Sequence, residues 1–185
     1  MFNNPLITAS LNKWPWFAIT IVVLILDQTT KSAAVEHLIE RQIQGFLPYF
    51  NFTLLYNEGA AFSLFSDAGG WQRWFLGIIA AVVSVILVIW ICRLERSQKL
   101  ELSGLAFILG GALGNLWDRI YLGKVVDFVD WFYPSSNGCL PFFYQRTDLQ
   151  SCHWPVFNIA DSAILLGVFL LIIDMFLHKK EKGTS

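Results

Sequence analysis

Four long apolar stretches divide the chain, and polar segments separate them. The clearest stretch runs from Trp71 to Cys92 and is almost continuously aliphatic or aromatic. A glycine-rich apolar stretch covers about residues 102–121, and a further one covers about 157–177. A helix that crosses a lipid bilayer needs about 20 mostly apolar residues. Each of these three stretches therefore predicts a transmembrane helix.

The first apolar stretch is less regular than the other three. Residues 16–26 are apolar, but the polar run 27–32 follows directly. A short apolar core before Ser32-Ala33-Ala34 is also typical of a signal peptide with its cleavage site, which is one reading of this region. Against it, only Lys13 supplies the positive region that should precede such a core. We therefore predict a fourth spanning helix over about 15–35, whose polar residues face protein.

Two charged residues of this first helix need partners within the protein, because ionisable groups inside a membrane are costly. Asp27 and Lys31 are four residues apart, so they share one helix face. We expect them to form a structural polar pair that holds the first span to its neighbours.

The composition agrees with lipid as the main solvent. Of 185 residues, 55% are hydrophobic and 15% are charged, whereas an ordinary soluble domain is about 25% charged. The net charge of −1 gives no reason to expect nucleic-acid binding. The length favours a single domain over residues 1–185.

The distribution of basic residues predicts the orientation of the chain. With four spans, both ends lie on one side, and segments 36–70 and 122–156 lie on the other. Cytoplasmic segments carry an excess of Lys and Arg. Seven such residues flank the spans on the terminal side, namely Lys13, Arg93, Arg96, Lys99, Lys179, Lys180 and Lys182, and three lie in the two other segments, namely Arg41, Lys124 and Arg146. We therefore expect cytoplasmic termini and two extracytoplasmic segments.

Both extracytoplasmic segments contain strand patterns. Residues 49–56 are aromatic and β-prone, and Asn57-Glu58-Gly59 is a turn signal. Residues 124–132 alternate, which places Val125, Asp127 and Val129 on one side of a strand. The predicted fold class is thus a membrane all-α protein with a small β element, in which four transmembrane helices carry an extracytoplasmic β platform.

Two aspartates stand out at the same predicted depth on the extracytoplasmic side. Asp127 lies just past the third span, and Asp161 lies about one turn inside the fourth. A single acid in a first helical turn can simply be favoured by the helix dipole. Two carboxylates held close together, however, share one proton, so that one acts as a base and the other as an acid. This pattern is typical of an aspartic protease.

The glycine-rich third span adds further polar candidates. Gly110 and Gly114 have the spacing that lets membrane helices approach closely, which is a packing role. Asn115 and Arg119 follow on one helix face near its outer end. Arg119 suits a local ion pair as well as it suits a catalytic site.

Other chemistries find little support. The chain has no nucleophile-elbow pattern and no His-Glu-x-x-His motif. Cys139, Cys152 and His153 supply only three soft metal ligands, which makes a weak case for a metal site. We expect neither a metal nor an organic cofactor.

Four blocks of residues resemble the lipoprotein signal peptidases (signal peptidase II) of bacteria, and the resemblance covers nearly the whole chain. The blocks are Asp27-Gln28-Thr29-Thr30-Lys31; Asn57-Glu58-Gly59-Ala60-Ala61-Phe62; residues 110–115 with Asp118-Arg119 and Val126-Asp127-Phe128; and Phe157-Asn158-Ile159-Ala160-Asp161. Each block alone is weak, but their order and their placement relative to four spans are specific.

The resemblance implies an enzyme of the bacterial inner membrane that cuts the signal peptide from diacylglyceryl-modified prolipoproteins, just before the lipidated cysteine. The family's catalytic aspartate pair corresponds to Asp127 and Asp161. Its other polar positions correspond to residues that we expect to position the substrate or the pair, namely Asn57, Asn115, Arg119 and Asn158. Gly59 would give the adjoining loop, up to Phe62, the freedom to move as a lid. The implied partners are these substrates and membrane lipids, and we expect a monomer.

One segment departs from the family pattern. The stretch between Asp127 and Asn158 looks longer than usual and contains Cys139 and Cys152. On an extracytoplasmic side these cysteines either form a disulfide or stay as two thiols. A disulfide would add roughly 3 kcal/mol in the chain-entropy model. Cys92 is expected to be a small apolar residue.

Two other classes of function remain open from the sequence alone. A small transporter or channel is one, since intramembrane polar residues also mark ion pathways. Its lining would come from Asp27, Lys31, Asn115, Arg119 and Asp161. A non-catalytic assembly factor that uses the β platform is the other.

Overall fold

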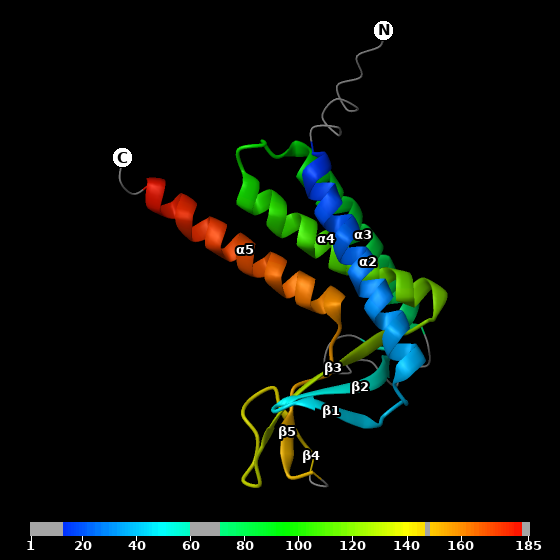
Figure 1. Cartoon of the computed structure of the whole chain (residues 1–185). Helices are drawn as coiled ribbons and strands as arrows, with labels where there is room; N and C mark the ends of the chain where they lie inside the picture. Colours follow the sequence, from blue (N-terminus) through cyan, green and yellow to red (C-terminus); the bar gives the residue numbers. More distant parts are fainter. Residues whose placement is uncertain (1–12, 60–70, 147–148, 183–185) are drawn as a thin grey trace. The chain divides into compact units, whose positions relative to one another are not determined.

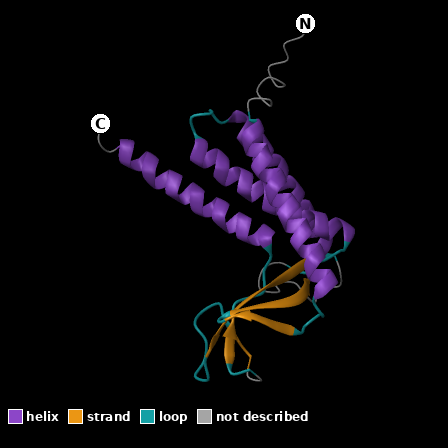
Figure 2. Cartoon of the chain, in the orientation of Figure 1, coloured by secondary structure: helices purple, strands orange, loops and turns teal. Residues whose placement is uncertain are grey.

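The computed structural model describes residues 13–59, 71–146 and 149–182, which form two compact units. The first unit takes in residues 13–27, 78–117 and 159–182, and the second takes in residues 28–59, 71–77 and 118–158 apart from 147–148. The first is helical, and the second contains the strands together with helix ends (Figures 1 and 2).

Four helices are long and apolar enough to cross a membrane. They are α2 (Trp14–His37), α3 (Gln72–Arg93), α4 (Lys99–Tyr121) and α5 (Ile159–Lys182). The predicted membrane fold with four spanning helices is confirmed. The helix α2 runs without a break through the polar residues 27–32, and α5 continues past the predicted end at residue 177. That the whole chain acts as one protease domain stays a prediction.

The helical unit is built around a compact apolar core at one end of its helices. The core residues come from α2, α3 and α4, and they are Trp16, Leu87, Ile91, Leu102, Leu105, Ala106 and Leu109. Burial of such side chains contributes roughly 1.5–3 kcal/mol each in water. Between membrane helices, close packing itself is the more important term, because lipid is as apolar as the side chains.

Glycines of α4 bring this helix into backbone contact with two neighbours. A Cβ atom on Gly110 would lie 2.7 Å from the Cβ of Val23 in α2, and one on Gly111 would lie 2.3 Å from the carbonyl oxygen of Ala160 in α5. Real Cβ contacts are not that short. The glycine-rich stretch is therefore a packing surface, as its spacing indicated.

The second unit contains a five-stranded antiparallel sheet with the order β1-β2-β3-β5-β4 (Figure 1). The strands are β1 (Ile43–Leu47), β2 (Phe50–Asn57), β3 (Val125–Pro134), β4 (Tyr144–Arg146) and β5 (Ser151–His153). The predicted strand patterns at 49–56 and 124–132 correspond to β2 and β3. The strands β1, β4 and β5 were not predicted from the sequence.

A disulfide fastens the segment between Asp127 and Asn158. Cys139 and Cys152 are bonded, with their Cα atoms 5.5 Å apart. Cys152 belongs to β5, which pairs with both β3 and β4. This segment therefore forms a stapled extension of the sheet.

Candidate functional site

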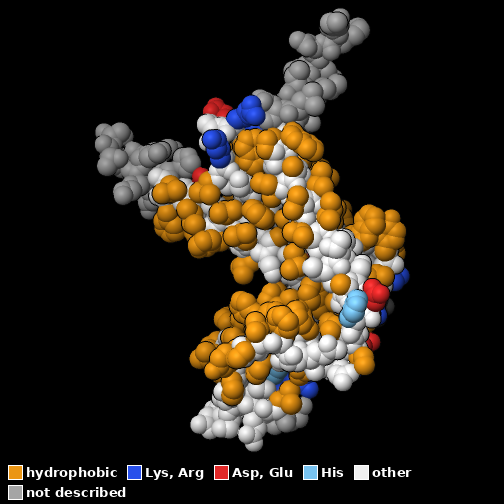
Figure 3. Space-filling model, viewed as in Figure 1, with side chains coloured by type: hydrophobic (Ala, Val, Ile, Leu, Met, Phe, Trp, Pro, Cys, Tyr) orange, Lys and Arg blue, Asp and Glu red, His pale blue; other side chains and the backbone are white. Residues whose placement is uncertain are grey.

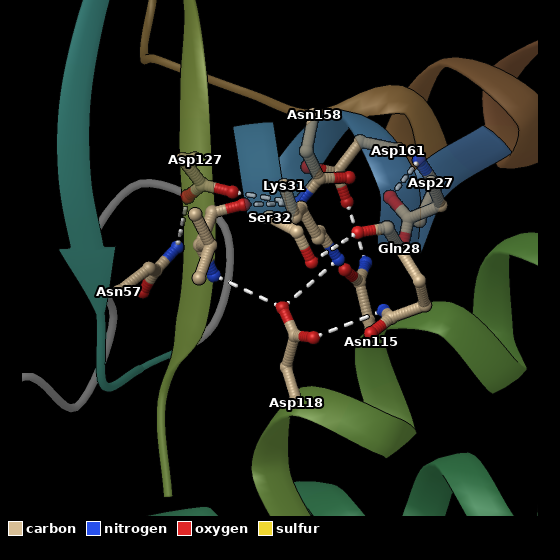
Figure 4. Close-up of polar contacts among 12 residues, drawn as sticks. Asp27, Gln28, Lys31, Ser32, Asn57, Asn115, Asp118, Asp127, Asn158 and Asp161 are labelled. Carbon is tan, nitrogen blue, oxygen red and sulfur yellow. Dashed lines mark hydrogen bonds and ion pairs between the residues drawn. The ribbon is translucent and has the colours of Figure 1, made fainter. Parts of the chain in front are cut away.

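Asp127 lies in β3 and is held by two asparagine side chains (Figure 4). The amide nitrogen Nδ2 of Asn158 donates to its Oδ1 at 2.7 Å, and Nδ2 of Asn57 donates to its Oδ2 at 3.2 Å. The Asp127 residue is only 4% exposed. Because a buried carboxylate is stabilised by hydrogen-bond donors, the two amides fix both the position and the orientation of this acid.

Strand pairing explains how these three residues meet. Leu55 of β2 lies opposite Asp127, so that Asn57 follows two positions later on the same strand. On the other side of Asp127, the amides of Phe128 and Val129 donate to the carbonyl oxygen of Phe157. This contact places Asn158, the next residue, against β3, where its Nδ2 also donates to the carbonyl oxygen of Val126 at 3.2 Å.

Asp161 lies in the first turn of α5 and is partly buried. Nδ2 of Asn115, on α4, donates to its Oδ1 at 2.8 Å. Asn115 follows Gly111 by one turn of α4, and Gly111 is where the backbones of α4 and α5 touch. The close helix contact thus brings the amide within reach of the carboxylate.

Asp27 caps the beginning of α5. Its Oδ1 accepts a hydrogen bond at 2.9 Å from the backbone N–H of Ala160, one of the amides that a helix leaves without a partner in its first turn. Its Oδ2 lies 2.5 Å from where a Cβ atom of Gly114 would be. The absence of a side chain at residue 114 therefore makes room for this acid. A carboxylate at a helix N-terminus is also favoured by the helix dipole.

No role was predicted for Asp118 from the sequence, where it is one of several polar residues near the end of the third predicted span. It is buried and forms a salt bridge of 3.0 Å with Lys31. It also accepts hydrogen bonds from Nε2 of Gln28 at 3.0 Å and from the backbone N–H of Val126 at 3.1 Å. Asp118 therefore joins α2, the end of α4 and the start of β3 (Figure 4). Asp118 lies only eight residues before Val126 in the chain, and this proximity was the sequence signal for their contact.

Arg119 and Gly59 are brought together in the second unit. Nη2 of Arg119 donates to the carbonyl oxygen of Gly59 at 3.4 Å, and the N–H of Gly59 donates to Oδ1 of Asn57 at 3.0 Å. Asn57 therefore links this loop to Asp127. The lid predicted to continue to Phe62 reaches residues outside the described part of the chain.

A second polar cluster occupies the sheet extension, and sequence reasoning missed it. Nδ1 of His153 lies 2.8 Å from Oδ1 of Asp130, and its Nε2 lies 2.9 Å from Oγ of Ser151. The order of groups resembles a Ser-His-Asp triad. Ser151, His153 and Asp130 are all buried, and the cluster joins β3 to β5.

Nearby, Tyr144 stacks on His153 with a centroid distance of 5.8 Å. Burial raises the pKa of Tyr144 above its usual 10.0, the negative charge of Asp130 raises that pKa further, and Arg146 opposes both. The phenol therefore stays protonated, and β4 gains an aromatic contact with β5.

No metal-binding group of three or more His, Cys, Asp or Glu residues occurs in residues 13–59, 71–146 and 149–182. The sulfurs of Cys139 and Cys152 are already joined to each other. The metal site considered for Cys139, Cys152 and His153 is therefore not supported by the donor chemistry, since bonded sulfurs are not thiolate ligands.

Comparisons with known proteins agree with one another. The family described as signal peptidase (SPase) II matches residues 19–177. The lipoprotein signal peptidase of Teredinibacter turnerae is 46% identical over 89% of this chain and 89% of that protein. The lipoprotein signal peptidase of Acinetobacter baumannii is 45% identical over 92% of this chain and 88% of that protein. A solved bacterial membrane enzyme, determined by the in meso method at 2.3 Å resolution, superimposes with a TM-score of 0.73 at 28% identity and covers 91% of both chains.

Proposed function

Because this chain belongs to the signal peptidase II family of membrane proteases, we propose that Asp127 and Asp161 form its catalytic pair. The family's members bear the name lipoprotein signal peptidase, and the chain accordingly removes signal peptides from prolipoproteins. The family match supports a protease over the transporter and the assembly factor. The observation that carries the proposal is that each of these two aspartates accepts an amide hydrogen bond from the asparagine of the other aspartate's sequence block.

The covalent chain gives further support for pairing the two acids. Asn158 donates directly to Asp127, and Asp161 is only three residues further on. Only two residues, Ile159 and Ala160, separate Asn158 from Asp161 in the chain, which limits how far apart the two can lie. The pairing therefore requires the Asp161 side chain to point back along its helix, which is the usual direction for helical side chains.

The proposed reaction uses one proton held between the two carboxyl groups. The ionised aspartate removes a proton from water, whose oxygen then attacks the carbonyl carbon of the scissile peptide. The protonated aspartate gives its proton to the carbonyl oxygen, which forms a neutral tetrahedral intermediate. Collapse of the intermediate breaks the C–N bond, and the leaving nitrogen takes up the proton that the base removed. One hydroxyl of the intermediate returns its proton to the other aspartate, which restores the pair with a single shared proton. No metal or organic cofactor enters this scheme.

The surrounding polar residues then have distinct positioning roles. Asn57 and Asn158 would hold Asp127, and Asn115 would hold Asp161. Arg119 and Gly59 would order the loop next to Asn57. Asp27 and Lys31 would act through helix packing, because their partners are the N-terminus of α5 and Asp118.

We place the substrate's scissile bond at the surface of the bacterial membrane. A signal peptide is an apolar helix and diacylglyceryl chains are soluble in lipid, so both can arrive laterally. The cut would fall just before the lipidated cysteine, on the extracytoplasmic side, with the enzyme acting as a monomer. Irregular backbone at membrane depth has to be covered by protein or water, which the sheet and its loops can supply.

The decisive experiment replaces each aspartate by its amide. Asp127→Asn and Asp161→Asn keep nearly the same size but remove the carboxyl chemistry, so each should reduce cleavage of a purified diacylated prolipoprotein by at least about 1000-fold. Thermal unfolding in detergent should change little. Near-normal turnover of either folded variant would refute the proposed pair.

A matched control comes from an acid of the same sheet. Asp130→Asn changes a carboxylate three residues along β3 whose partners are His153 and Asn51. Because Asp130 has no role in the proposed reaction, its loss should lower stability while turnover per folded molecule persists. If Asp130→Asn abolished turnover as completely as Asp127→Asn, position on β3 rather than catalysis would explain both results.

A further inference from the structure

The stapled extension of the sheet presents an apolar tip, which we define as residues 138–143. Its sequence, Gly-Cys-Leu-Pro-Phe-Phe, contains no charged residue. Leu140 is 63% exposed and Phe142 is 72% exposed. Soluble surfaces seldom hold neighbouring large apolar side chains in this way, and where they do, the patch marks a contact site.

The tip is held in place by several bonds. Cys139 is fixed by the disulfide, and the N–H of Leu140 donates to the hydroxyl of Tyr133 at 2.7 Å. The ring of Phe143 packs on Tyr133 and on Trp154, with centroid distances of 5.2 and 5.3 Å. The exposure of Leu140 and Phe142 is therefore built into the fold.

The backbone conformation at Phe142 also indicates a functional role for this exposure. Its φ is 72°, in the left-handed region that a bulky residue rarely adopts. Strained positions persist only where the surrounding structure imposes them, and they cluster at active sites, ligand clamps and switch regions. Here the strained residue is the most exposed aromatic side chain of the tip.

An aromatic hollow adjoins the tip. It has a volume of about 390 Å³ and is lined by apolar side chains from the turn before β2, from β3 and from the tip itself. The lining residues include Tyr49, Phe50, Trp131, Tyr133 and Phe143. Figure 3 shows hydrophobic side chains gathered over the sheet. A hollow of this size and polarity suits part of a hydrocarbon chain.

The same compact unit contains the surface where the membrane spans end. Trp71 and Trp74 at the start of α3 and Tyr121 at the end of α4 are exposed, and all three belong to the second unit. Aromatic residues at span ends lie at the level of the lipid headgroups. The unit that carries the tip therefore already has a bilayer contact.

We infer that the tip and the adjoining hollow form a second lipid contact, in which Leu140 and Phe142 insert into the interfacial region of the bilayer. The partner is membrane phospholipid, because the surface is apolar, uncharged and part of a unit that reaches the bilayer. The contact would anchor the sheet extension, and the inference does not depend on the identity of the catalytic pair.

The test places a photoreactive residue, benzoylphenylalanine, at position 142 of the full chain in nanodiscs of phosphatidylethanolamine and phosphatidylglycerol. The matched control carries it at Asn137, an exposed polar position of the same extension. Irradiation should give a phospholipid-mass adduct at position 142 and none at position 137. Equal adducts at both positions, or none at 142, would overturn the inference.

A substrate contact is the competing outcome. With a diacylated prolipoprotein added, capture of that protein at position 142 without any phospholipid adduct would assign the tip to substrate binding instead. The native chain provides a measurement free of folding effects. A phospholipid with a diazirine in its acyl chain should label the peptide that contains residues 139–143, as it labels the peptide with Trp71 and Trp74. Labelling of the latter peptide alone would also reject the inference.

Discussion

At the scale of single residues, the role of each buried acid follows from the groups that it binds. Asp118 has a cation, an amide side chain and a backbone N–H as partners. Asp27 accepts a hydrogen bond from a backbone N–H at the N-terminus of α5. Charges taken out of water need such partners, since the cost of an uncompensated buried charge exceeds most other single contributions to stability. We therefore expect these two acids to have structural roles, unlike the catalytic role proposed for Asp127 and Asp161.

Replacement of Lys31 by methionine tests this assignment. Lys31→Met keeps the length of the side chain but leaves Asp118 buried without its cation. We expect it to lower the free energy of unfolding by about 3–5 kcal/mol, measured by thermal and chemical unfolding of the purified protein in detergent. Turnover per folded molecule should change much less.

Ser32→Ala is the matched control for Lys31→Met. Ser32 is the next residue of α2, is exposed, and donates only to the carbonyl oxygen of Gln28 at 2.8 Å among the contacts described. Its replacement should change stability by no more than about 0.5 kcal/mol. A Lys31→Met protein with full stability but no turnover would move Lys31 into the catalytic machinery.

At the scale of elements, one glycine-rich helix packs against two others. Gly110 meets α2 at Val23, whereas Gly111, one position on, meets α5 at Ala160. Adjacent positions of a helix point in directions about 100° apart, because there are 3.6 residues per turn. Consecutive glycines thus let α4 approach two neighbours at once.

Gly111→Ala should separate α4 from α5. The new Cβ would lie 2.3 Å from the carbonyl oxygen of Ala160 and 2.7 Å from Cγ1 of Ile164, so a backbone has to move. We expect a loss of about 1–3 kcal/mol in unfolding free energy. Turnover should fall as well, because the hydrogen bond from Asn115 to Asp161 joins the same two helices one turn away. Unfolding in detergent and a cleavage assay measure the two effects.

Gly45→Ala provides the comparison for Gly111→Ala. The nearest atom to a Cβ at Gly45 is Oδ1 of Asn51 at 3.8 Å, an ordinary contact. Stability and turnover should both stay close to those of the native chain. Equal losses in the two alanine variants would show that glycine flexibility, rather than close helix approach, is what matters at position 111.

The disulfide staple should stabilise the sheet extension locally. Cys139→Ser together with Cys152→Ser removes the crosslink, and the chain-entropy model assigns roughly 3 kcal/mol to a loop of this length. We expect faster amide hydrogen exchange in β4 and β5, whereas the exchange of α3 and α4 stays unchanged. Cys92→Ser, at the only cysteine with a free thiol, should leave all four elements unaffected. Uniform destabilisation of the chain would contradict a local role.

The elements differ in how far the sequence determines them. The spans follow from their length and apolar composition. The strands β2 and β3 follow from β-prone and alternating residues. The strands β4 and β5 have only three residues each, too few for a pattern. They depend on contacts distant in sequence, such as Asp130 with His153 and Cys139 with Cys152. Likewise, motif residues could be named from the sequence, but the salt bridge from Lys31 to Asp118 required the fold.

At the scale of the whole molecule, two independent features bear on orientation. The excess of basic residues on the terminal side becomes smaller when two further arginines are counted on the opposite side. Arg73 lies in the first turn of α3, and Arg119 lies in the last turn of α4. They add to Arg41, Lys124 and Arg146 on that side. The disulfide is unaffected by that count. Disulfides persist in oxidising compartments and are rare in the cytosol, so we expect the segment with Cys139 and Cys152 to lie outside the cytoplasm.

Reporter fusions test this orientation directly. Because α2 to α5 can each cross a membrane, we expect residues 14 and 182 to lie on the same side, opposite to the disulfide. Fluorescent protein joined after Ser185 should therefore fluoresce, and alkaline phosphatase at the same point should be inactive, since it needs its own disulfides. Alkaline phosphatase inserted after Asn137, in an exposed part of the extension, should be active. The reverse pattern would put the disulfide in a reducing compartment and Asp127 on the wrong side of the membrane for exported prolipoproteins, so it would overturn both the orientation and the proposed site of cleavage.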